Sequence, residues 1–299
     1  MKRNSFAIKL AALIFTFNLL GCSSAPKRTM ERTDITDSAY SRLALANTEL
    51  SKGDFVPAKN DLDFAYNSAL SVDNADLLTK VCLTKITLET ALSSENKNEL
   101  NKNCLSYLKE AKSYASRSSD VELFNSICDL YESRILINDS TDLEKALSLC
   151  NGIEKIISKE KQYLAYMYRT RGEIYLAQKK NDLAVEQFLA AAELHTKERY
   201  LSEIGLDWYF ASRAYSYSNQ KQNALDSLQN ALKYDRLDEN TTGIASDYYG
   251  LAVVLSNSNP TDEEKLLAIK YANYSAQIYK AGGFDQYAEK SLALVNKIK

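Results

Sequence analysis

The chain is poor in the residues that interrupt regular structure. Its 299 residues include only nine glycines and three prolines, whereas average usage is about 7% and about 5%. A protein made of many short strands needs more of these turn residues. The composition therefore favours long helices and argues against an all-β fold.

Histidine is scarcer still, which restricts the chemistry that the chain can perform. His195 is the only histidine, and no Cys-x-x-Cys pair or phosphate-binding glycine loop occurs. A zinc site, a dithiol redox centre and a nucleotide-binding loop therefore each lack their usual pattern. We expect no metal, no cofactor and no catalytic residue. We expect His195, near the end of a helix, to have a surface position facing a loop.

Long apolar runs and an excess of basic residues are also absent. After residue 21, no segment approaches the roughly 18 consecutive apolar residues that indicate a membrane-spanning helix. The formal net charge is −2, and it becomes −5 without residues 1–21, which hold three basic residues and no acidic one. This balance argues against a nucleic-acid partner, because proteins that bind nucleic acids usually carry a basic patch.

What the chain does have begins with a leader-like segment. Basic residues at its start are followed by a stretch from Leu10 to Leu20 that is apolar apart from Thr16 and Asn18. A permanent membrane helix needs about 20 apolar residues, so this shorter stretch is typical of a secretory signal. A buried or membrane helix that happens to end in a cysteine is the alternative.

The segment ends in Leu19-Leu20-Gly21-Cys22, which resembles a bacterial lipobox. The resemblance implies that residues 1–21 are a lipoprotein signal peptide, that Cys22 receives a lipid, and that residues 22–37 form a flexible tether. The next residue is Ser23 rather than Asp, which in Gram-negative lipoproteins favours an outer-membrane anchor facing the periplasm. The inner membrane and the cell surface are the alternatives.

Four further cysteines are evenly placed. Cys82 and Cys104 lie 22 residues apart, as do Cys128 and Cys150. Each pair flanks a break between two helical stretches at about equal distances, near residue 93 for the first pair, and equidistant residues of an antiparallel hairpin lie opposite each other. Because export leads to an oxidising compartment, we predict the disulfides Cys82–Cys104 and Cys128–Cys150. Four unpaired core thiols are the alternative.

Small residues recur at fixed intervals along much of the chain. Residues 165–198 carry Gly172, Tyr175, Ala184, Phe188 and Ala191 at positions 8, 11, 20, 24 and 27 of a 34-residue unit. Residues 39–72 and 205–238 show similar spacing, with Glu49 departing from it at position 11 of the first unit. The pattern resembles the tetratricopeptide repeat (TPR), in which small residues let two helices approach and large residues fill the gaps between stacked hairpins.

The resemblance covers residues 38–299 and implies an all-α, TPR-like helical-hairpin solenoid of about six hairpins with a C-terminal capping helix. Residues 73–158 form divergent hairpins, residues 243–281 a loose repeat and residues 284–299 the cap. Helix boundaries are expected at the capping-box patterns Ser119-x-x-Glu122, Thr141-x-x-Glu144 and Thr261-x-x-Glu264 and at Gly282-Gly283. A generic helical bundle with coincidental alanine spacing is the alternative.

In TPR proteins, set positions of the first helix of each repeat line the concave face. Carried onto this chain, those positions give the predicted partner-binding residues Tyr166, Arg169, Glu173, Tyr209, Arg213 and Tyr217. The first repeat adds Tyr40, Leu43, Asn47, Leu50 and Ser51. Tyr and Arg dominate the energetics of protein interfaces. The alternative is that many of the tyrosines fill the packing between repeats, as expected for Tyr175 and Tyr215.

These features predict a membrane-anchored scaffold of the bacterial cell envelope that binds envelope proteins or peptides through its concave face and is not an enzyme. An accessory ligand- or solute-binding lipoprotein of a transport system is the second hypothesis, and an enzyme is the third. An open groove lined by Tyr and Arg favours the scaffold. A closed apolar cavity of several hundred Å³ favours the ligand carrier.

Overall fold

The computed structural model describes residues 34–92, 97–139, 142–257 and 259–299. The predicted signal peptide, the predicted lipidation site Cys22 and most of the predicted tether lie outside these residues. The described residues form thirteen α-helices and one short 3-10 helix, with no strand among them.

The helices are α2 (Asp34–Lys52), α3 (Phe55–Ser71), α4 (Ala75–Leu92), α5 (Lys97–Ala115), α6 (Val121–Asp139), α7 (Leu143–Ile153), η1 (Ile156–Lys159), α8 (Lys161–Ala177), α9 (Asn181–Glu198), α10 (Leu201–Tyr217), α11 (Lys221–Leu237), α12 (Thr241–Ser256), α13 (Asp262–Ala281) and α14 (Asp285–Ile298).

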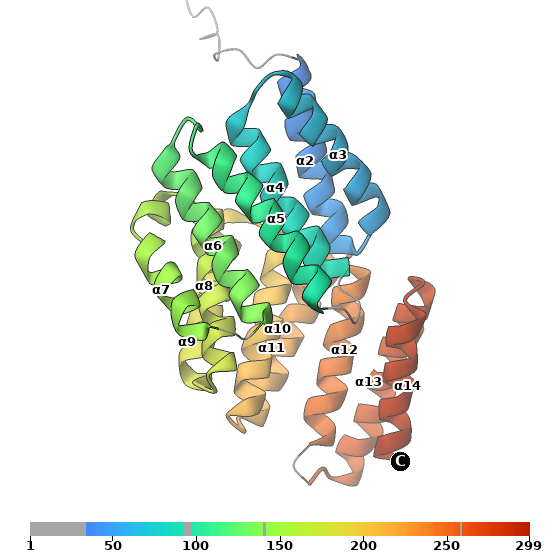
Figure 1. Ribbon diagram of the computed structural model, residues 1–299. Helices are drawn as coiled ribbons and strands as arrows, with labels where there is room; N and C mark the ends of the chain where they lie inside the picture. Colours follow the sequence, from blue (N-terminus) through green and yellow to red (C-terminus); the bar gives the residue numbers. More distant parts are fainter. Residues whose placement is uncertain (1–33, 93–96, 140–141, 258) are drawn as a thin grey trace, which may run out of the picture.

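Consecutive helices pack as six antiparallel hairpins, from α2–α3 to α12–α13, and α14 packs against α13 (Figure 1). This arrangement confirms the predicted helical-hairpin solenoid with a C-terminal capping helix. The short helix η1 joins the third hairpin to the fourth. Helix α2 already begins at Asp34, so residues 34–37 are helical where the sequence predicted the end of a flexible tether.

Glycines let neighbouring helices approach closely, both within a hairpin, as at Gly172 of α8 against α9, and between hairpins, as at Gly250 of α12 against α11. A Cβ atom built on Gly172 would lie 2.6 Å from the ring of Phe188, and one on Gly250 would lie 2.7 Å from Leu228. Real Cβ atoms essentially never come this near a neighbour, so a larger residue at either position would force the facing side chain to shift. The buried apolar residues form a series of clusters along the chain, as expected of stacked repeats.

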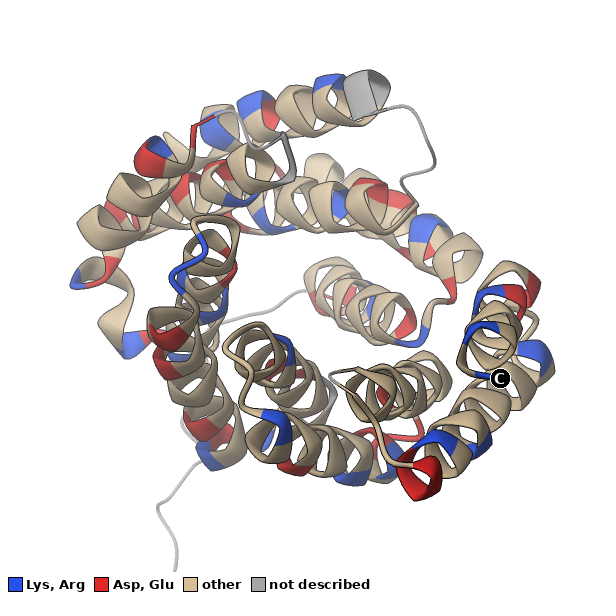
Figure 2. Ribbon diagram, turned by 90° about the horizontal axis from the view of Figure 1, so that it is seen from below, with Lys and Arg blue, Asp and Glu red and all other residues tan. Residues whose placement is uncertain are grey.

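The hairpins follow a curved path (Figure 2). Two pockets lie between their first helices, and we call these two pockets together the central hollow. The turn between α2 and α3 lies against the C-terminal part of the chain. A Cβ atom on Gly53 would lie 3.2 Å from the ring of Phe284 and 3.5 Å from the methyl group of Thr242. The first hairpin therefore touches the last helices, and together they surround the hollow.

The helix boundaries match the sequence signals in part. Thr261 and Glu264 form the predicted capping box, with both reciprocal hydrogen bonds present, and α13 ends at Ala281, just before Gly282. Helix α6 is instead capped by Asp120, which accepts from the N–H of Leu123. Helix α7 is capped by Asp142. At these two sites the cap lies one residue after the predicted Ser119 and Thr141, because aspartate there is an equally good capping residue.

The structure contradicts the two predicted disulfides. Its described cysteines are all free and buried: Cys82, Cys104, Cys128 and Cys150. Asn103 of α5 donates to Glu89 of α4, so the two helices pair in a register that does not bring Cys82 opposite Cys104. Burial, followed by the nearby charge of Glu110, raises the pKa of the Cys82 thiol to about 12. Cys82 therefore faces the level of Glu110, about six residues from Cys104.

The hairpin α6–α7, which carries Cys128 and Cys150, shows a similar offset. The Cys150 sulfur lies 3.2 Å from the hydroxyl of Ser133, which is five residues beyond Cys128 on α6. Two cysteines at equal distances from a turn lie opposite each other only if the centre of the turn is known to a single residue. In both hairpins the helices are offset from the register that the sequence pattern suggests.

Candidate binding site in the central hollow

The first helix of every hairpin contributes side chains to the hollow. Two adjoining pockets occupy it and share Asn47, Thr87, Gln162, Tyr166 and Glu203. One has a volume of about 300 Å³ and is called here the tyrosine pocket, because Tyr40, Tyr131, Tyr163 and Tyr166 line it. The other has a volume of about 400 Å³ and is called the acidic pocket, after Glu203, Asp235 and Asp247.

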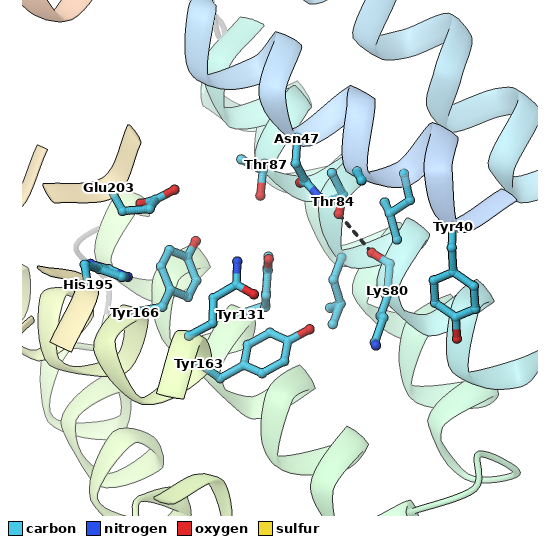
Figure 3. A pocket seen from close by; sticks show the side chains of 14 residues that line it. Tyr40, Asn47, Lys80, Thr84, Thr87, Tyr131, Tyr163, Tyr166, His195 and Glu203 are labelled. Carbon is cyan, nitrogen blue, oxygen red and sulfur yellow. Dashed lines mark hydrogen bonds between the residues drawn. The ribbon is translucent and has the colours of Figure 1, made fainter. Parts of the chain in front are cut away.

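Helical periodicity explains which residues reach these pockets. Helix α8 presents Gln162, Tyr166 and Arg169, and α10 presents Glu203, Leu206 and Tyr209. Residues three or four apart lie on one face of a helix, so each first helix turns a single stripe of side chains inward. In Figure 3, Tyr131, Tyr163 and Tyr166 come from one wall of the tyrosine pocket, and Asn47, Thr84 and Thr87 from another.

Tyr166 is the central residue of the site. Its ring centroid lies 5.6 Å from that of Tyr131, and the guanidinium carbon of Arg134 lies 4.7 Å from it. Burial raises the pKa of both tyrosines above the ordinary value. Both rings therefore stay neutral and offer an aromatic surface with a hydroxyl group at its edge, which suits contact with a polypeptide.

A buried ion network lies beneath the two pockets. The Nε of Arg169 donates to Oδ1 of Asp207, and its Nη1 donates to Glu203. Nδ1 of His195 lies 2.6 Å from Oδ2 of the same aspartate. Burial opposes the charge of Glu203, but the charge of Arg169 outweighs it and lowers the pKa of that carboxyl. The network fixes the orientation of α8, α9 and α10 relative to one another.

His195 corrects an expectation from the sequence. It is only 1% exposed and helps to line the tyrosine pocket, whereas the sequence predicted a surface position. The reason is Asp207, which lies on the next helix and binds the imidazole. A histidine close to a helix end looks solvent-exposed in the sequence, because the partner that buries it is 12 residues away.

The six predicted partner-binding residues divide into three groups. Tyr166, Arg169 and Tyr209 line the acidic pocket. Glu173 is instead bound to Arg134, with 2.8 Å between its carboxylate and the guanidinium. Arg213 and Tyr217 are exposed and line neither pocket, because the pockets take from α10 only residues in its first half.

The sequence missed several residues of the site. Lys80 and Thr87 of α4 and Arg134 of α6 lie in the divergent hairpins, where no repeat register was assigned. A stripe of inward-facing residues could have been extended to these helices by periodicity alone. Asp235 and Asp247 gave no such signal, since acidic residues on a helix usually face water.

Neither a metal site nor a membrane span is evident in the described ranges. No group of three or more His, Cys, Asp or Glu residues there could hold a metal ion. No helix among the described residues is long and apolar enough to cross a membrane.

The comparisons with known proteins show the fold. No protein-family model and no curated protein sequence matches the chain. A solved Rap protein complexed with competence and sporulation factor matches with a TM-score of 0.60 at 16% identity, over 88% of this chain and 71% of that chain. The apo form of RapI matches with a TM-score of 0.52 at 12% identity, over 87% and 97%.

A third match extends the same architecture to a different protein. It is a signal-transduction ATPase with a tetratricopeptide-repeat sensor from Pyrococcus horikoshii, with a TM-score of 0.50 at 14% identity, over 87% of this chain and 39% of that chain. At such identities the likeness concerns the fold alone. The chain therefore has an all-α, TPR-like helical-repeat fold.

Proposed function

We propose that this protein binds a segment of a partner protein, or a peptide, in the central hollow. The observation that carries the proposal is that all six hairpins turn their first helix toward the same pair of adjoining pockets. A continuous surface of this length suits an extended polypeptide. Helical-repeat proteins use such concave surfaces for recognition.

The chemistry of the lining supports a polypeptide ligand. Tyr166 and Tyr209 supply aromatic surface, while Asn47, Thr87 and Gln162 supply amide and hydroxyl groups that can bond a peptide backbone. A carrier of an apolar small molecule would need a closed, mostly apolar cavity. The tyrosine pocket includes Lys80 and Glu203, and five charged residues line the acidic pocket, which favours the polypeptide over an apolar ligand.

The cellular place of this binding is part of the proposal. The lipobox-like residues Leu19 to Cys22 support attachment to a bacterial membrane by lipid at Cys22. The protein then acts as an anchored scaffold of the cell envelope, at the outer membrane and facing the periplasm, and its partners are envelope proteins or peptides.

Photo-crosslinking in intact cells tests the binding proposal. Benzoylphenylalanine replaces Gln162, an exposed residue that lines both pockets, and in a matched control it replaces Leu266, which is 70% exposed on α13. We expect a discrete polypeptide adduct from position 162 and none from position 266. Adducts at 266 alone, or a small molecule as the only species bound at 162, would contradict the proposal.

A further inference from the structure

Two buried carboxyl groups form one end of the acidic pocket. Asp235 of α11 is 2% exposed and Asp247 of α12 is 0% exposed, and both line the pocket. The Asp235 carboxyl fits between α10 and α12 only because glycines face it. A Cβ atom on Gly205 would lie 2.6 Å from it, and one on Gly243 would lie 2.4 Å from it.

This pair lacks a positively charged partner. Neither carboxylate oxygen of Asp247 has a hydrogen-bond partner, while Asp235 accepts one hydrogen bond of 2.9 Å from the amide of Asn240. The two carboxyl groups lie close enough for the charge of Asp235 to raise the pKa of Asp247. Ionised carboxylates only accept hydrogen bonds, so neither carboxylate can satisfy the other.

The basic residues of the pocket are already committed elsewhere. Arg169 binds Asp207 and Glu203, and Arg134 binds Glu173. The other titratable groups beside Asp247 are Tyr209 and Tyr279, whose pKa values are raised by burial and, to a lesser degree, by its charge. No basic side chain that lines the acidic pocket is therefore left to pair with these two carboxyl groups.

Burying two neighbouring carboxyl groups without a basic partner costs free energy unless another interaction offsets it. Burial raises the pKa of Asp235 to about 6, and burial together with the charge of Asp235 raises that of Asp247 well above its ordinary value. A buried polar group without a partner costs free energy, and strongly perturbed carboxyls in a pocket are candidates for a functional site.

We infer that the Asp235–Asp247 pair receives a cationic nitrogen, the ammonium or guanidinium group of a basic residue in the bound polypeptide. The inference rests on the proposed function for the nature of the occupant. A charged N–H donor supplies the hydrogen bonds that Asp247 lacks. Tyr209 lines the same pocket, and an aromatic ring can stabilise a cation that lies over its face. A free polyamine carries the same chemistry and is the other source of such a group.

The test uses the purified full-length protein and four mixtures of labelled hexapeptides. Each mixture is random except at a central position, which is Arg, Lys, citrulline or Glu, with both ends blocked. Citrulline keeps the shape of arginine without its charge. Spermidine serves as the non-peptide probe, and binding is measured by fluorescence anisotropy and calorimetry.

We expect the Arg and Lys mixtures to bind at least about tenfold more tightly than the citrulline and Glu mixtures, in keeping with a charge-assisted hydrogen bond in a buried site. Asp247→Asn and, separately, Asp235→Asn should abolish this preference. Asp226→Asn is the matched control, because Asp226 is exposed on the same helix as Asp235. Circular dichroism of each variant checks that it is folded.

The outcomes separate this inference from the proposed function. Equal binding of all four mixtures, unchanged in Asp247→Asn, would overturn the cation site and leave polypeptide binding intact. Asp247-dependent binding of spermidine without any peptide binding would support the cation site and overturn the polypeptide occupant. Failure of the protein to bind any probe would overturn both.

Discussion

Asp207 and Asp247 are both fully buried, but their surroundings differ. Asp207 is bound by the guanidinium of Arg169 and the imidazole of His195, so its burial is compensated within the protein. Asp247 has no such partner. At the scale of single residues, the first carboxyl belongs to the framework of the hollow, and the second is available to a ligand.

Arg169 was predicted from the sequence as a partner-binding residue, and its burial makes it chiefly structural. Arg169→Ala leaves Asp207 buried beside only the imidazole of His195, so we expect a loss of about 3–5 kcal/mol in the free energy of unfolding. Arg213→Ala, at an exposed position of α10, should change it by less than about 0.5 kcal/mol. Urea denaturation measures both, and similar values for the two variants would contradict this role.

The carboxyl pair should make stability depend on pH. Folding raises the pKa of both carboxyls, and that of Asp235 rises from 3.8 to about 6. Between about pH 4 and pH 6 the folded state therefore binds more protons than the unfolded state. Stability therefore falls as the pH rises from about 4 to above 6. Asp247→Asn should therefore raise the free energy of unfolding more at pH 8, where the charged form is favoured, than at pH 4.5.

Urea denaturation of the wild type, Asp247→Asn and the exposed control Asp226→Asn at both pH values provides the measurement. The groups facing Asp247 are Asp235 on α11, Tyr209 on α10 and Tyr279 on α13, and the tyrosines do not titrate in this range. An equal effect of Asp247→Asn at pH 4.5 and pH 8 would show that its charge is not responsible.

At the scale of the helical elements, glycines distinguish close packing from open surface. Gly172 faces Phe188 of the partner helix, whereas a Cβ atom on Gly152 of α7 would have nothing within 4 Å. Gly172→Ala should lower the free energy of unfolding by about 1–3 kcal/mol, because the added methyl group overpacks the helix contact. Gly152→Ala should raise it by up to about 1 kcal/mol, because alanine has the higher helix propensity. Thermal unfolding compares the two, and recovery of Gly172→Ala by an added Phe188→Leu would identify the clash.

The hairpins were predictable from the sequence because their packing depends on residue size at fixed spacing, as at Gly172 and Phe188. The cysteine pairing was not predictable, because any error in the assumed centre of a hairpin moves the opposing residue by twice as much. Part of the site was also predictable, since Tyr166 and Tyr209 follow from the repeat register. Asp247 was not, because its burial depends on helices α10, α11 and α13 together.

At the scale of the whole molecule, contact between the first and last hairpins encloses the hollow. Asn47, Leu50 and Ser51 of α2 and Thr242, Ser246 and Asp247 of α12 line the same acidic pocket. A solenoid whose ends did not meet would leave this pocket without one wall. The site therefore depends on nearly the full length of the described chain.

The proposed anchor is also a property of the whole molecule. In a Gram-negative host, the protein should incorporate labelled palmitate and pellet with outer membranes. Cys22→Ala should lose the label, while Cys104→Ala, which removes a buried thiol, should keep it. Label that persists in Cys22→Ala would show that Cys22 is not the lipidation site.

Hydroxyl-radical footprinting of the tyrosines shows whether a partner occupies the central hollow, because it compares the protein in intact cells with the purified protein without requiring a known partner. We expect Tyr163, Tyr166 and Tyr209, which line the two pockets, to be oxidised less in cells than in the purified protein. Tyr217 and Tyr287, which are 58% and 52% exposed, should be oxidised equally in both. Protection of Tyr217 and Tyr287 with no change at the pocket tyrosines would contradict binding in the hollow.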